Sequence, residues 1–173
     1  MNETSLTVEH PSRRLVADLP GTFDEARDRY EQLVPEVDRV AFAAARSWSE
    51  QIEIAKEKAP LGFMRYGSID IGPFMADSLS PGVATQYLMG NHTIAETMFR
   101  YDPAVMLHAP LRTLIYVSPD GNTRLALDQP SLLFGSYGDA RISQVGRRLD
   151  SMVAELISAL GADVPHELTG ESA

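Results

Sequence analysis

The chain contains no cysteine, which excludes disulfide bonds, thiolate metal sites and a cysteine nucleophile. It has no apolar run near the roughly 18 residues that a membrane span requires. Its first ten residues, MNETSLTVEH, show neither the basic nor the apolar region of a signal peptide. With a net charge of −9, the chain lacks the basic stripe of a nucleic-acid binder and would be repelled by an anionic membrane. These absences predict a cytoplasmic protein with no nucleic-acid or membrane partner.

What is present predicts one folded domain. The chain has 173 residues, 44% hydrophobic and 23% charged, which is enough for a single sizeable core. We expect a flexible N-terminus over residues 1–11, one α+β domain over residues 12–161, and a C-terminal tail over residues 162–173. No internal repeat or low-complexity tract divides the domain.

Hydrophobic spacing and turn residues predict the order β-α-(α)-β-β-α-β-β-α. Strands are expected at residues 13–19, 63–71, 83–89, 111–117 and 123–128; helices are expected after Thr22, within residues 36–59, from His92 and over residues 142–160; residues 131–138 are expected to form a loop. Thr22 and Glu25 have the spacing of a capping box. Strands and helices do not alternate strictly, so the order favours a mostly antiparallel sheet in an α+β fold.

The run Gly90-Asn91-His92-Thr93-Ile94-Ala95-Glu96 is the most informative local feature. It joins an expected strand to an expected helix, where free backbone N–H groups can face a ligand. His92 and Glu96 are four residues apart and so share a helix face, which suits an acid–base pair or metal ligands. The alternative is an ordinary helix start, with Asn91 as N-cap and Glu96 favoured by the helix dipole.

From Tyr87 onward the chain carries a series of matching landmarks. They are Gly90-Asn91, Asp102-Pro103, Ala109-Pro110-Leu111-Arg112, Leu114 to Val117, Asp128-Gln129-Pro130 and the helix from Arg141. In these stretches the chain resembles the bacterial domain of unknown function 302 family. The resemblance covers roughly residues 12–160 and is weak between residues 35 and 62, where this chain is longer. His92 stands where the family usually has proline, and one extra residue lengthens the Asp128-Gln129-Pro130 step.

The resemblance implies a fold similar to that of the TATA-binding protein. In that fold a curved antiparallel sheet is gripped by a long C-terminal helix, and an apolar cavity can lie between them. The resemblance implies no established reaction, so function has to be sought in the residues.

Four further side chains are candidates for ligand binding. His108 lies in an apolar segment, and Arg112 at the start of a strand could clamp a carboxylate or phosphate. Tyr66 and Asp70 share one face of an expected strand and Arg65 lies on the other, so only one group can face a concave sheet surface. A half-buried structural histidine and an edge salt bridge are the alternatives for His108 and Arg112.

These residues predict a protein that binds a small molecule in an apolar cavity, with a possible cofactor-independent isomerisation, cyclisation or elimination. His92 would act as acid or base, oriented by Glu96, while Asn91 and Arg112 would bind an oxygen or carboxylate. The further ligand-binding candidates are His108, Tyr66 and Asp70.

Two alternative functions stay open at the level of the sequence. One is a non-catalytic ligand sensor, carrier or accessory protein. The other is metal or haem binding through His92 or His108, with Glu96 or Asp70 as a third metal ligand. No particular cofactor is indicated. A homodimer is also expected, since open antiparallel sheets expose their edges.

Overall fold

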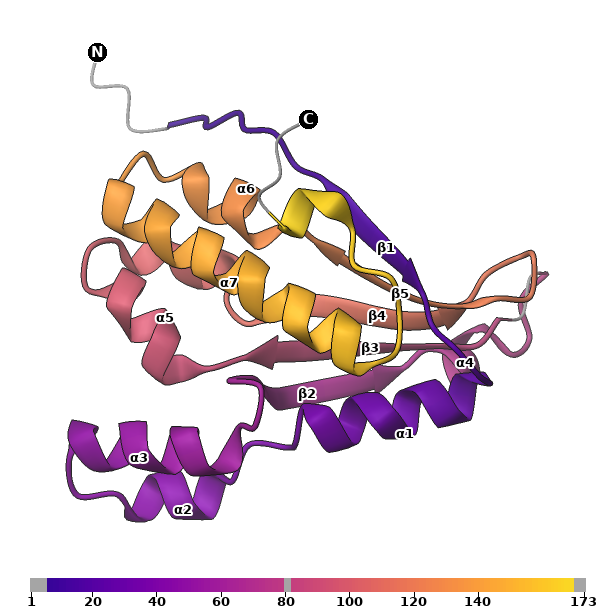
Figure 1. Ribbon diagram of the computed structural model, residues 1–173, viewed down its shortest axis with the longest axis horizontal. Helices are drawn as coiled ribbons and strands as arrows, with labels where there is room; N and C mark the ends of the chain where they lie inside the picture. Colours follow the sequence, from indigo (N-terminus) through magenta and orange to yellow (C-terminus); the bar gives the residue numbers. More distant parts are fainter. Residues whose placement is uncertain (1–5, 80–81, 170–173) are drawn as a thin grey trace.

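The computed structural model describes residues 6–79 and 82–169. Its centre is a five-stranded sheet in the order β1-β5-β4-β3-β2 (Figure 1). The strands are β1 Arg14–Asp18, β2 Met64–Asp70, β3 Ala84–Gly90, β4 Leu111–Val117 and β5 Thr123–Asp128. Every neighbouring pair is antiparallel, so the predicted α+β fold with an antiparallel sheet is confirmed. The edge strands are β1 and β2, and the homodimer expected from such edges stays a prediction.

The helices are α1 Phe23–Leu33, α2 Arg39–Ala44, α3 Trp48–Lys58, α4 Gly72–Met75, α5 His92–Phe99, α6 Pro130–Gly135 and α7 Ala140–Ala159, with 3-10 turns η1 Pro103–Leu107 and η2 His166–Leu168. The predicted capping box begins α1: the Thr22 side chain accepts from the Glu25 N–H, and Glu25 accepts from the Thr22 N–H. None of the helices within the described ranges has the length and apolar content that crossing a membrane requires.

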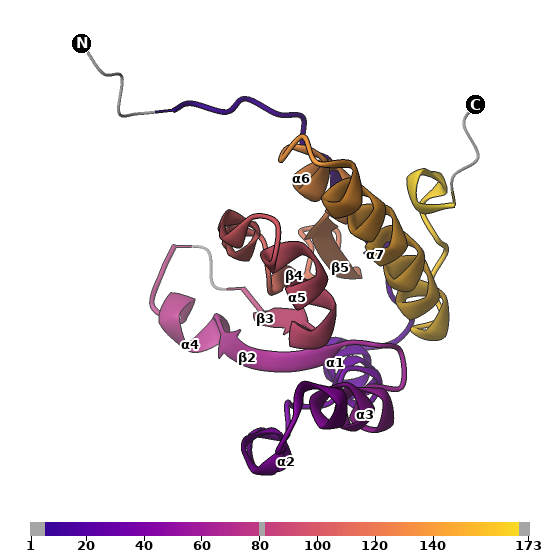
Figure 2. The same ribbon diagram turned by 90° about the vertical axis from the view of Figure 1, so that its left-hand side faces the viewer.

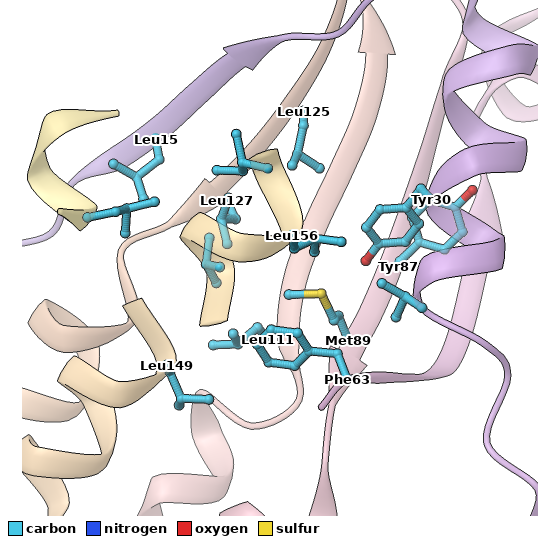
Figure 3. Close-up of a cluster of buried hydrophobic side chains, with 14 of the residues drawn as sticks. Leu15, Tyr30, Phe63, Tyr87, Met89, Leu111, Leu125, Leu127, Leu149 and Leu156 are labelled. Atoms are coloured by element: carbon cyan, nitrogen blue, oxygen red, sulfur yellow. The ribbon is translucent and has the colours of Figure 1, made fainter. Parts of the chain in front are cut away.

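One face of the sheet carries the main core. Alternate residues of β4, Leu111, Thr113 and Ile115, are buried, whereas Arg112 between them is exposed. This is the period of a strand with one covered face. The long helix α7 runs across that face (Figures 1 and 2), and its Val153 and Leu156 join the same hydrophobic cluster. Figure 3 shows Leu111 and Leu156 in this cluster, together with side chains of β3 (Tyr87 and Met89) and of β5 (Leu125 and Leu127). Each fully buried side chain of this size stabilises the fold by about 1.5–3 kcal/mol.

Helix α6 corrects the prediction of a loop over residues 131–138. Residues 130–135 are helical, with Pro130 at the first helical position, where proline fits well. The helix has no side-chain cap of its own. Instead, the buried Asp150 of α7 accepts hydrogen bonds from the Ser131 N–H (2.9 Å) and from Gln129 Nε2 (2.8 Å). The side chain that caps this helix comes from another helix, about three turns beyond the start of α7, so the neighbouring sequence contains no capping residue.

A glycine in α7 sets how closely α6 packs. A Cβ atom on Gly146 would lie 3.1 Å from both Phe134 Cβ and Ser131 Cα, so the close approach needs a residue without a side chain. Phe134 is thereby held fully buried beneath α7.

The segment that the family resemblance matched only weakly forms a helical hairpin. Residues 36–59 were predicted to be helical, and α2 and α3 confirm this; Ser47 caps α3 by accepting from the Glu50 N–H. We call residues 39–58 the α2–α3 hairpin. It has its own small hydrophobic cluster, which includes Phe42, Ala55 and Met64. In both views the hairpin lies beyond β2, apart from α7 (Figures 1 and 2).

The predicted tail is wrong over residues 162–169. Ala162 and Val164 pack against the main core, and Leu168 is itself buried. The remainder of the predicted tail, residues 170–173, and residues 1–5 of the predicted flexible N-terminus lie outside the described residues. Residues 6–9 are exposed and His10 is half-buried.

Candidate functional site

A cavity of about 160 Å³ lies where the junction at Gly90 meets α5, α6 and α7. Its walls are largely apolar and include Phe63, Met89, Met98, Phe134 and Leu149. The polar side chains that reach its lining are Tyr66, Asn91 and His92. The cavity therefore lies between sheet and helices, as the resemblance implied, and it borders the run of residues that the sequence singled out.

His92 is held by three hydrogen bonds. The Tyr66 hydroxyl lies 2.7 Å from His92 Nδ1 and also accepts from the His92 backbone N–H at 3.0 Å. On the other side of the ring, Nε2 lies 3.0 Å from Gln51 Oε1. Because Gln51 Nε2 donates to the Phe42 carbonyl oxygen, Oε1 must be the atom that faces His92 and accepts.

These partners define the protonation state of the imidazole. Nε2 carries the hydrogen that Gln51 accepts, and Nδ1 accepts from the Tyr66 O–H, so the ring is neutral. A second ring proton on Nδ1 would displace the Tyr66 hydrogen, which would then need a new acceptor. Burial acts in the same direction and lowers the pKa of His92. Burial also raises the pKa of Tyr66, since it disfavours the phenolate.

Asn91 is the N-cap of α5, as predicted. Its Oδ1 accepts from the Thr93 N–H at 3.0 Å and from the Thr93 hydroxyl at 2.7 Å. Its Nδ2 donates to the Gly62 carbonyl oxygen at 2.9 Å. Both ends of the amide therefore have a hydrogen-bond partner within the fold.

Glu96 does not orient His92, so that part of the predicted acid–base pair is wrong. Its carboxylate binds the guanidinium of Arg100, one helical turn further along α5. His92 and Glu96 are four residues apart on α5, as predicted. Arg100 is four residues beyond Glu96, and the carboxylate pairs with this arginine instead of with His92.

Asp70 is not part of the site. It is exposed at the far end of β2, where it pairs with Thr85, whereas Met64 at the near end pairs with Gly90. A β-bulge between Arg65 and Gly67 leaves Tyr66 without a partner on β3. Such a bulge redirects a side chain, so Tyr66 reaches His92. The predicted pairing of Tyr66 with Asp70 assumed an unbroken alternation and fails for this reason.

Arg112 and His108 also lie apart from His92. Arg112 is exposed on the sheet face opposite to that of its buried neighbour Leu111. The His108 ring contacts the rings of His10 and Tyr137, each with centroids 5.9 Å away. The predicted joint action of Arg112 or His108 with His92 is therefore wrong. A second hollow brings Arg112 and His108 together instead.

Three residues that contact His92 were not predicted from the sequence, and all of them lie in the α2–α3 hairpin. The His92 ring meets Phe42 edge-on with centroids 4.5 Å apart and Trp48 at 6.1 Å, and it binds Gln51. The resemblance described above implied two departures from the family, at His92 and in the extra length between residues 35 and 62. These two departures contact each other, a coincidence that the sequence held but that only the fold explains.

Among the described residues, no group of three or more His, Cys, Asp and Glu side chains is placed to hold a metal ion. His92 and His108, the histidines considered for this purpose, have different neighbours. No observation on these residues therefore favours the metal-binding alternative.

Comparison with known proteins places the fold but names no activity. The model of the family described as domain of unknown function DUF302 matches residues 79–160, which confirms the resemblance over that region. A crystal structure of an uncharacterized conserved DUF302 protein from Bacillus stearothermophilus superposes with a TM-score of 0.63 at 13% sequence identity, covering 85% of this chain and 97% of that one. A comparison with the curated proteins finds no match.

Proposed function

We propose that this chain, which carries a DUF302 region, binds a small apolar molecule in the cavity beside His92. The observation that carries the proposal is the volume and lining of that cavity. At about 160 Å³ it is close to a cavity of about 150 Å³, lined by apolar side chains, that is known to bind benzene or xenon. The expected ligand is therefore a single ring or a short branched hydrocarbon.

The saturated polar atoms at the cavity support an apolar ligand. Both ring nitrogens of His92 and both ends of the Asn91 amide are hydrogen-bonded within the protein. The Tyr66 hydroxyl uses its hydrogen on His92 and one lone pair on the His92 N–H. A polar ligand would find only the second hydrogen of Asn91 Nδ2 and the second lone pair of the Tyr66 oxygen without a partner among these bonds. An apolar ligand gains by leaving water at about 25 cal/mol per Å² of buried surface. We also propose that the protein is cytoplasmic, which agrees with the absence of cysteine.

Cofactor-independent acid–base catalysis is the second candidate function. Its supporting observation is the Tyr66–His92 pair on the cavity lining, through which a proton could pass from hydroxyl to imidazole. It ranks behind binding alone because burial raises the pKa of Tyr66, which makes the hydroxyl a weaker acid. In addition, the proposed orienting group, Glu96, is engaged with Arg100. A non-catalytic carrier or sensor needs neither group to react.

Fluorine NMR with fluorobenzene tests the proposal. We expect the wild-type protein to bind fluorobenzene and to be stabilised by it, because a ligand that binds only the folded state raises its stability. Ala95→Leu should abolish binding, since Ala95 is buried on the cavity wall. Ala159→Leu makes the same change on an exposed part of α7 and should leave binding intact. Native mass spectrometry of the gently purified protein would identify a molecule that co-purifies.

Two results would contradict this function. One is a wild-type protein that binds no fluorobenzene. The other is an Ala95→Leu protein that unfolds at the same urea concentration as the wild type and still binds fluorobenzene as the wild type does. Ala95→Val provides a smaller change if the leucine variant fails to fold, and it should weaken binding without abolishing it.

A further inference from the structure

We propose that a second hollow, which adjoins the cavity, binds the carboxylate or phosphate group of an amphipathic organic anion. The hollow measures about 520 Å³, and the ionisable residues of its lining are His10, His108, Arg112 and Asp128. We call it the His108 hollow. Three groups that carry or can acquire positive charge thus converge on one concave surface of a chain whose net charge is −9.

Hydrogen-bonding capacity distinguishes this hollow from the cavity. The guanidinium of Arg112 makes no hydrogen bond or ion pair within residues 6–79 and 82–169, and the same is true of the His108 ring nitrogens, which have only aromatic neighbours. His10 uses Nδ1 on the Pro11 carbonyl oxygen at 3.2 Å, which leaves Nε2. Donors from three side chains are therefore available to one oxyanion, and charge-assisted hydrogen bonds of this kind are the strong ones.

The groups that face His108 are two bases, His10 and Arg112, and one carboxylate, Asp128. Burial lowers the pKa of His108, and the positive charges of His10 and Arg112 lower it further, while Asp128 opposes them. Tyr137 also faces the ring but is uncharged, since burial raises its pKa. Asp128 is directly opposite Arg14 in the β1–β5 register, so its negative charge has a positive neighbour on the same sheet face. An oxyanion would supply the charge that His108 lacks and would raise the pKa of His108.

The rest of the lining indicates that the anion has an apolar body. Leu88, Met106 and Leu107 border the same hollow and are 38%, 44% and 81% exposed. A bare phosphate would leave most of the hollow empty and these side chains in water. A ring or chain attached to the oxyanion would cover them, which contributes about 25 cal/mol per Å² of buried apolar surface.

The His108 hollow is independent of the proposed cavity ligand. The two spaces adjoin and share Met106, Ala109, Pro110 and Leu111 in their linings. Arg112, next to Leu111, projects to the opposite face of β4 from the core. Arg112 does not line the cavity and Ala95 does not line the hollow, so each can be changed without altering the lining of the other space. The two proposals can fail separately.

Titration of the His108 ring signals by NMR, with His108→Gln to assign them, tests the inference. The probes are benzoate and phenyl phosphate, with benzamide as the uncharged counterpart of benzoate. Benzoate should raise the pKa of His108 by about one unit, which corresponds to about tenfold tighter binding at low than at high pH across that titration. Benzamide should leave the pKa unchanged. The tighter of the two anions identifies the headgroup.

Arg112→Gln should weaken benzoate binding by about tenfold or more, since one charge-assisted hydrogen bond contributes about 1.5–3 kcal/mol. Arg148→Gln removes the same charge from an exposed site on α7 and should bind as the wild type does. Equal weakening by the two variants, or equal responses of His108 to benzoate, benzamide and chloride at matched ionic strength, would overturn the inference. Fluorobenzene binding should be unchanged by Arg112→Gln, and benzoate binding unchanged by Ala95→Leu.

Discussion

His92 and His108 resemble each other in environment and differ in what their rings do. Each is half-buried, each has a pKa lowered by burial, and each packs edge-on against aromatic side chains. His92, however, has both ring nitrogens hydrogen-bonded within the protein, whereas the ring nitrogens of His108 have no such partner among the described residues. A buried histidine whose bonds are satisfied stabilises a structure, and one with unused donors and acceptors is free to bind.

The sequence predicted one site that contains both histidines, whereas the structure has them in two different regions. His92 joins the α2–α3 hairpin to the start of α5, and the cavity beside it offers apolar surface. His108 lies with Arg112 in a hollow that offers charge. Size and chemistry differ accordingly, at about 160 Å³ for the cavity and about 520 Å³ for the hollow.

Replacing each histidine by alanine should give the largest difference between the regions. His92→Ala removes two side-chain hydrogen bonds and the contacts with Phe42 and Trp48, so we expect the free energy of unfolding to fall by about 2–3 kcal/mol. His108→Ala removes only ring contacts and should cost about 1 kcal/mol or less. Urea denaturation measures both. The reverse order would show that His92 does not hold the hairpin.

Removing one hydroxyl from each region gives a smaller and more specific effect. Tyr66→Phe leaves His92 Nδ1 and the His92 N–H without their partner, and should cost about 1–2 kcal/mol. Tyr137→Phe removes the bond to the Ala104 carbonyl oxygen in a more exposed setting and should cost about 0.5 kcal/mol. Hydrogen exchange should show lost protection in α3 for Tyr66→Phe alone. Unchanged exchange in α3 would separate the hairpin from this network.

The pH dependence of stability should show the smallest difference. The pKa of His92 is lower in the folded protein than its ordinary value of 6.5, so the unfolded chain binds the proton more readily. This contribution is complete above pH 6.5 and is lost as the pH falls below it, toward the folded pKa. His92→Asn should therefore reduce the loss of stability between about pH 7.5 and about pH 5.5.

His108 provides the control for this pH effect. Its pKa is lowered too, but saturating benzoate should raise it and so remove its share of the pH dependence, while the share of His92 persists. Stability curves with and without benzoate measure this. If benzoate altered the pH dependence of the His108→Gln protein as strongly as that of the wild type, the anion would act elsewhere.

Much of the fold could be predicted because its signals are local. The alternation in β4, the capping box at Thr22 and the helical spacing of α7 each lie within a few turns of chain. Helix α6 was missed since its cap comes from Asp150, and the position of Tyr66 was missed since a β-bulge interrupts the alternation of β2. Each feature had only a weak local signal: Pro130 at the first position of α6 and Gly67 beside the bulge in β2.

The sequence predicted where the candidate site lies along the chain, but it did not predict which side chains meet there. The sequence singled out Gly90, Asn91 and His92, and all three line the cavity. It assigned Glu96 to His92, and this was wrong. Glu96 is four residues from both His92 and Arg100 on α5, and its carboxylate forms the stronger, charged pair with Arg100. The partners that His92 does have, Gln51 and Tyr66, are 41 and 26 residues away along the chain.

By itself the sequence determined the elements, the antiparallel α+β class and the residues at which strand gives way to helix, since these depend on short-range spacing and on backbone preference. Only the tertiary structure decided which side chains meet. It satisfied the ring nitrogens of His92. Within the described residues it left the ring nitrogens of His108 and the guanidinium of Arg112 without a hydrogen-bond partner. Hydrogen bonds and cavities depend on contacts between distant segments, and those exist only once the chain has folded.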